Sequence, residues 1–73
     1  LDVEGATARI EALLEQRERF GWIEAVGERA TLVDVLSTFI ALLELARRGR
    51  LSLAQPEPFA PMEIRRESPR DAA

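Results

Sequence analysis

Residues 31–49 read TLVDVLSTFIALLELARRG, and this stretch decides the fold because it predicts one long helix with a defined start and end. Thr31 can cap the N-terminus through its hydroxyl, and Asp34, three residues later, completes a capping box. Gly49 follows two arginines, so cations lie at the negative end of the helix dipole and the glycine suits a left-handed C-cap. We therefore expect a single helix over 31–49.

The apolar residues of this helix predict which side faces the core. One row recurs at steps of three and four residues and forms the expected buried face: Leu32, Val35, Leu36, Phe39, Leu43 and Ala46. Further apolar residues, among them Val33 and Ile40, widen the apolar surface to about half of the cylinder. Leu45 lies nearly opposite the row, beside Thr38 and Ala41, so we expect these three to face water. A helix this apolar must be covered on most sides.

Composition excludes several functions. The chain has 73 residues, which allows one domain at most, and it has no cysteine and no histidine. A disulfide framework, thiolate chemistry and an ordinary zinc site are therefore excluded, which fits a cytosolic protein. The formal net charge of −3 argues against extensive electrostatic binding to nucleic acid. Glu44, Arg47 and Arg48 interrupt the longest apolar run, so we expect no membrane span.

The residue types also favour a protein that is not an enzyme. The sequence lacks histidine, cysteine, lysine and tyrosine, so acid–base and nucleophile roles fall to Asp, Glu, Ser or Thr alone. The carboxylates lie mostly on the expected solvent faces of helices, interleaved with arginines. We find no glycine-rich phosphate loop and no cluster with metal-ligand spacing. We expect no catalytic residue, no cofactor and no metal.

The other segments predict a small α+β domain. We expect a first helix over about 7–20, capped by Thr7, with Ile10, Leu13 and Leu14 on its buried face. A brief strand over 20–23 and one helical turn over 24–29 precede the long helix. Residues 50–55 and 62–66 alternate polar and apolar, which predicts a hairpin whose loop holds three prolines. Residues 1–6 are expected to be an extension and 67–73 a flexible tail. This order is that of a winged helix-turn-helix over 7–66, with three helices and a hairpin wing.

Part of the sequence resembles a known family. Within residues 38–55, the runs FIALLEL, ARRGR and LSLAQ follow one another, and Phe59 and Ile64 come after them. This combination resembles the C-terminal domain of bacterial segregation and condensation protein A (ScpA), the bacterial kleisin. The resemblance covers residues 31–64 well and 7–26 more loosely. It departs from the family in the proline-rich wing and at Arg65 and Arg66.

The resemblance implies a function and partners. It implies a winged helix that binds the ATPase head of an SMC protein, in the cytoplasmic, nucleoid-associated complex that condenses and segregates chromosomes before cell division. Segregation and condensation protein B (ScpB) would bind through kleisin regions outside this chain. The partner-binding residues that we expect come from the long helix and the hairpin: Thr38, Ile40, Ala41, Leu45, Gln55, Phe59, Met62 and Ile64.

Two alternatives stay open. The first is a winged-helix DNA-binding domain that would use Arg47, Arg48 and Arg50. Against it, the expected outer face of the long helix offers little that could read a base edge, and Asp34 would be repelled by phosphate. The second is a homodimerisation module.

Overall fold

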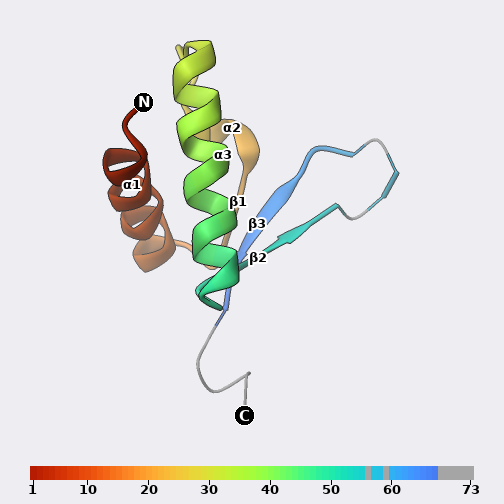
Figure 1. Ribbon diagram of the computed structural model, residues 1–73. Coiled ribbons are helices and arrows are strands. Elements are labelled where there is room, and N and C mark those ends of the chain that lie inside the picture. The colour runs from red at the N-terminus through yellow and green to blue at the C-terminus, as the bar shows by residue number, and fades with distance from the viewer. Residues whose placement is uncertain (56, 59, 68–73) are drawn as a thin grey trace.

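The structure is a computed structural model in which residues 1–55, 57–58 and 60–67 are described. The elements are α1 (Val3–Gln16), β1 (Arg19–Gly21), α2 (Trp22–Val26), α3 (Leu32–Arg47), β2 (Leu51–Ala54) and β3 (Glu63–Arg66) (Figure 1). The strands form one antiparallel sheet in the order β1-β3-β2. The described part of the chain is therefore an α+β domain with the winged-helix order of elements, as predicted.

The ends of α3 form as the sequence predicts. The Asp34 amide donates to the Thr31 hydroxyl at 3.2 Å, and the Thr31 amide donates to the Asp34 carboxylate at 2.9 Å, which completes the capping box. At the other end, Gly49 has a φ of 76°, a value that favours glycine. The amides of Gly49 and Arg50 donate to the carbonyls of Ala46 and Leu45, the bond pair of a Schellman motif.

The first helix begins earlier than predicted. Asp2 is its N-cap, and the Asp2 side chain accepts a hydrogen bond from the Gly5 amide at 2.9 Å. Thr7 lies inside α1, where its hydroxyl donates to the Val3 carbonyl, so the prediction that Thr7 caps the helix is wrong. Ala6 is buried in the core, so the helix and the packed core extend into residues 3–6. Of the expected tail 67–73, only Glu67 lies within the described residues.

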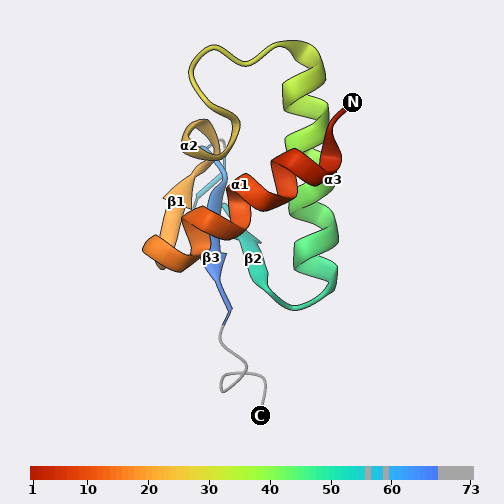
Figure 2. The same cartoon turned by 90° about the vertical axis from the view of Figure 1, so that its left-hand side faces the viewer.

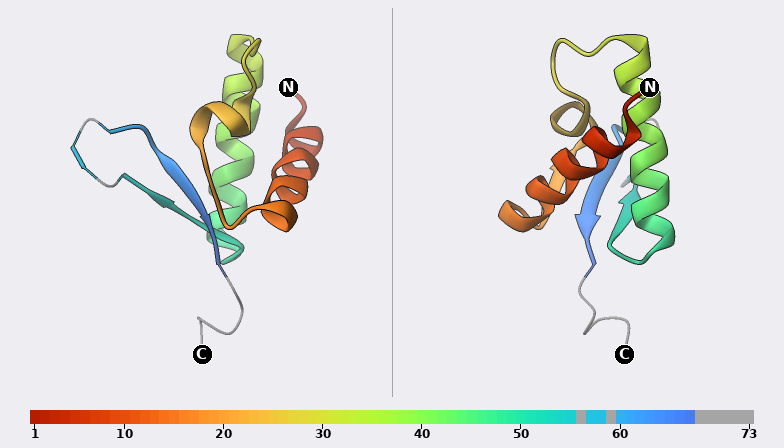
Figure 3. Two further views of the ribbon diagram at one scale, coloured as in Figure 1. Left: turned by 180° about the vertical axis from the view of Figure 1, so that it is seen from behind. Right: turned by 60° about the vertical axis from the view of Figure 1, so that its left-hand side comes forward.

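The helices pack on one face of the sheet. Figure 2 shows α1 crossing in front of the strands, and Figure 3 shows the hairpin of β2 and β3 projecting away from the helices. The strand register aligns Phe20 with Ile64 and Ile64 with Leu53. Alternate residues therefore point to the helices, and the core holds Ala6, Ile10, Leu14, Phe20, Ala25, Ala41, Leu42, Leu45, Leu51 and Ile64.

The structure turns α3 to the opposite face from the predicted one. Thr38, Ala41 and Leu45, expected to face water, are each 0% exposed. The expected inward row is largely solvent-facing, with Leu32 74% exposed and Leu43 47% exposed. The predicted orientation of this helix is wrong.

The reason is the size of the side chains on the two sides. Ser37, Thr38 and Ala41 are small, so α1 can approach α3 closely along them. Thr38 is satisfied there, because the Arg9 guanidinium donates to its hydroxyl at 2.8 Å and also donates to the Ala25 carbonyl at 3.2 Å. The number of apolar residues predicted that the row with large side chains faces the core. Close packing against α1 instead places the side with small residues inward.

Candidate protein-docking surface

The buried orientation of α3 leaves a second apolar face toward solvent. We call the exposed apolar residues Leu32, Val33, Leu36, Phe39, Ile40 and Leu43 the outer face of α3. They recur at three- and four-residue steps over about 16 Å of helix, and no charged or hydrogen-bonding side chain interrupts them. A helix that is apolar on all sides is normally buried, so this face is suited to cover by another element.

An apolar groove adjoins this face. It has a volume of about 460 Å³ and is lined by Gly21, Trp22, Ile23, Glu24, Phe39, Pro61 and Met62. Trp22 and Phe39 meet edge to face, with ring centroids 6.2 Å apart. The Trp22 amide donates to the Met62 carbonyl at 3.2 Å, which holds the junction of β1 and α2 against the start of β3. Phe39 therefore joins the groove to the outer face of α3 in one apolar surface.

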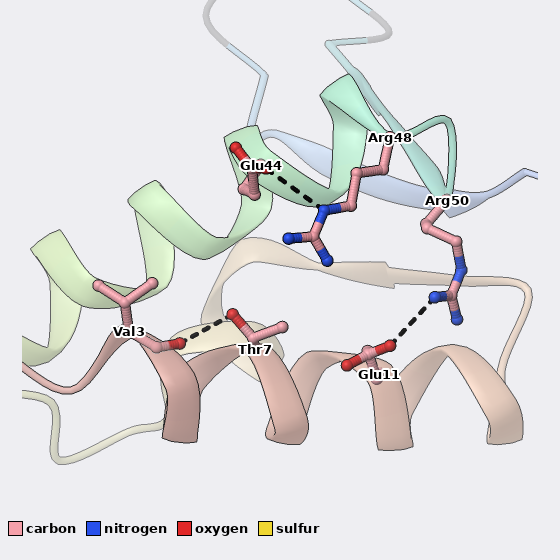
Figure 4. Close-up of polar contacts among 6 residues, drawn as sticks. All are labelled: Val3, Thr7, Glu11, Glu44, Arg48 and Arg50. Carbon is pink, nitrogen blue, oxygen red and sulfur yellow. Dashed lines mark hydrogen bonds and ion pairs between the residues drawn. The ribbon is translucent and has the colours of Figure 1, made fainter.

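Two of the three arginines at the end of α3 are engaged in ion pairs. Figure 4 shows Arg48 bonded to Glu44 at 3.3 Å and Arg50 bonded to Glu11 at 3.1 Å, both in the region where α1 and α3 lie side by side. These pairs are exposed and contribute little to stability, but they engage both guanidinium groups. Arg47 is exposed and is in none of the ion pairs found among the described residues.

The structure places some of the predicted partner-binding residues at the surface and others in the core. Ile40 lies on the outer face of α3, Met62 is half-buried in the groove wall, and Gln55 is exposed with its side-chain amide donating to the Ala60 carbonyl. Phe59 lies outside the described residues. The remaining four are buried in the domain, where their side chains cannot reach a partner: Thr38, Ala41, Leu45 and Ile64. The exposure that we predicted for Thr38, Ala41 and Leu45 is therefore wrong, and Ile64, predicted to contact a partner, belongs to the core.

Most residues of the outer face of α3 were predicted from the sequence to lie in the core. Leu32, Leu36, Phe39 and Leu43 were predicted to be buried, and Ile23 was not identified at all, although it is 63% exposed. The signal that could have found them is the run of small residues at 37, 38 and 41, which marks the side where two helices approach closely.

Among the described residues, a clear pKa shift belongs to Asp34 at the start of α3. Hydrogen bonds from the backbone and hydroxyl of Thr31 lower the pKa of Asp34, which is a capping effect at the start of α3. Residues 1–55, 57–58 and 60–67 contain no group of three or more carboxylates that could hold a metal ion. Within the same residues, no helix is long and apolar enough to cross a membrane.

Comparison with known proteins adds no assignment. No protein-family model matches this chain, and no curated protein matches it significantly.

Proposed function

We propose that this domain is a kleisin-type winged helix that binds the ATPase head of an SMC protein through the outer face of α3 and the adjoining groove. It would act in the cytoplasm as part of an SMC–ScpA–ScpB complex that condenses and segregates chromosomes. It would do so without catalysis and without direct nucleic-acid contact. ScpB would bind kleisin regions outside this chain.

The observation that carries the proposal is the exposed apolar face of α3. Its large side chains, such as Leu36 (47% exposed) and Phe39 (42% exposed), lie at helical spacing in water. Full burial of such a side chain from water is worth about 1.5–3 kcal/mol, and because these are already about half covered, covering the rest contributes roughly half of that for each. The resemblance of residues 38–55 to the kleisin C-terminal domain supports an SMC head as the partner.

The same face disfavours the DNA-binding alternative. A helix that reads the major groove presents hydrogen-bonding side chains to base edges. Between Leu32 and Leu43, the outer face of α3 presents none. Arg48 and Arg50, which that alternative requires, already bond to carboxylates.

The test is the affinity of this domain for the isolated SMC head, measured by calorimetry. We expect wild-type binding and a loss of about thirtyfold or more in Leu36→Arg, because a charge would be buried at the centre of the interface. Ala12→Arg is the matched control, since Ala12 is exposed on α1 away from this face and receives the same charge. The Ala12→Arg variant should bind the SMC head with the affinity of the wild type.

Two results would contradict the proposal. One is a wild-type domain that does not bind the head. The other is a Leu36→Arg variant that keeps wild-type affinity with an unchanged circular-dichroism melt. A gel-shift titration at low salt tests the DNA alternative separately, and appreciable duplex affinity with a steep salt dependence would favour it.

A further inference from the structure

The outer face of α3 ends in a single positive charge. Arg47 lies four residues after Leu43 and seven after Ile40, so it belongs to the same side of the helix. It is exposed, and it lies about one helical turn, roughly 6 Å along the axis, beyond Leu43. A protein segment that covers the face from end to end therefore also meets Arg47.

The charges in the groove wall and along the C-terminal half of the outer face are paired within the domain. Glu24, in the groove wall, pairs with Arg17, and Glu63 pairs with Arg65 at 2.6 Å. On the opposite border, Glu44 pairs with Arg48. At the C-terminal end of the outer face, Arg47 is therefore the charge that meets a partner, and the complementary group on that partner is a carboxylate.

A second copy of this domain fits this charge poorly. If two α3 helices met in parallel, Arg47 would face its own equivalent. If they met antiparallel, Arg47 would approach the N-terminal end of the other α3, where the helix dipole is positive. Within the first turn of α3, the one acid is Asp34, which lies about 140° around the helix from Arg47 and is bonded to Thr31. The charge of Arg47 therefore favours a different protein, and not a second copy of this domain, as the partner that covers the outer face of α3.

The spacing of the face indicates the shape of the partner element. Leu32, Leu36, Phe39 and Leu43 are separated by four, three and four residues, the alternating spacing of the apolar seam along which two helices pack side by side. An acid in the first turn of a partner helix is favoured by that helix's own dipole. Antiparallel packing on α3 would bring such an acid to Arg47.

We propose that the outer face of α3 receives an amphipathic helix of another protein, whose apolar row ends in a carboxylate that pairs with Arg47. This inference rests on the proposed function, in which the helix belongs to the SMC head. It adds the chemistry and the secondary structure of the site on that head.

Charge variants of two neighbouring arginines test the inference by calorimetry against the isolated SMC head. Arg47→Gln should weaken binding about tenfold or more, and the loss should shrink at high salt, where the pair is screened. Arg47→Lys should keep most of the affinity because it keeps the charge. Arg48→Gln is the matched control, since Arg48 is bonded to Glu44, and it should stay within about twofold of the wild type.

The outcomes separate this inference from the proposed function. A wild-type domain that binds the head while Arg47→Gln binds equally well overturns the inference and leaves the proposed function standing. A wild-type domain that does not bind the head overturns both. Light scattering of the domain alone should show a monomer, and a dimer that Leu36→Arg abolishes would assign the face to a second copy instead.

Crosslinking identifies the partner element directly. Because the sequence has no cysteine, Leu43→Cys gives one site for a thiol-reactive photocrosslinker. We expect the crosslinked head peptide to lie in a helix with Asp or Glu in its first turn. A crosslink to a strand, or to a helix without that acid, would overturn the inference.

Discussion

Replacing leucine by alanine on the two sides of α3 tests which side holds the core. Leu45 is 0% exposed, whereas Leu43 is 47% exposed. Leu45→Ala removes three buried carbon groups worth about 0.8 kcal/mol each, and the cavity left behind raises the expected cost to about 3–4 kcal/mol. Leu43→Ala removes the same groups from a half-covered position and leaves no enclosed cavity, so we expect a cost of about 1 kcal/mol or less.

Urea unfolding measures the difference, with Trp22, the only tryptophan, as the fluorescent reporter. A domain of this length has a free energy of unfolding of about 4–11 kcal/mol, so Leu45→Ala should remove a large part of it. The urea midpoint should fall with an unchanged slope, and Tm should drop by about 4–8 °C for each kcal/mol. Leu43→Ala should change both only slightly. Equal destabilisation by the two variants, or a larger effect at Leu43, would refute the orientation of α3.

Two further predictions concern polar contacts. Arg9→Met should lower the free energy of unfolding by about 1–3 kcal/mol, because the buried Thr38 hydroxyl then accepts no hydrogen bond from Arg9. The double variant Arg9→Met/Thr38→Val should lose less stability than the sum of the two single variants, because both changes remove the same hydrogen bond. Denaturant titrations of all three variants measure these differences. Asp34→Ala should lower Tm at neutral pH. The folded-state pKa of Asp34 lies below its ordinary 3.8, so its stabilising effect is present above that value and is lost as pH falls through the lower folded-state pKa. Melts in acid should therefore converge with the wild type, and a Tm difference that stays constant with pH would exclude this carboxylate as the cause.

The elements of the fold were predictable because their signals are local. The capping box of Thr31 and Asp34 and the positive φ of Gly49 depend on residues within one turn of the helix ends. The alternation that predicted β2 and β3 depends only on neighbouring residues, and both strands form where it lies. The start of α1 was missed because Thr7 can bond to a carbonyl inside a helix as readily as it can cap one.

The position of the candidate site was not predictable in the same way. A helix with apolar residues on both sides can be placed with either side inward, and hydrophobicity alone does not choose between them. The choice depends on α1, whose close approach requires small residues such as Ser37 and Ala41 and whose Arg9 reaches Thr38. The small residues at 37, 38 and 41 mark a side that a helix can approach closely, but only contacts between residues far apart in the chain place α1 there.

The sequence by itself determined that α3 forms, where it begins and ends, and that it carries large apolar residues on more than one side. Only the tertiary structure decided which apolar side packs inside the domain and which side stays exposed to solvent. The physical reason is packing: the side with small side chains fits against α1 at close distance, and the bulkier row that ends at Arg47 remains in solvent.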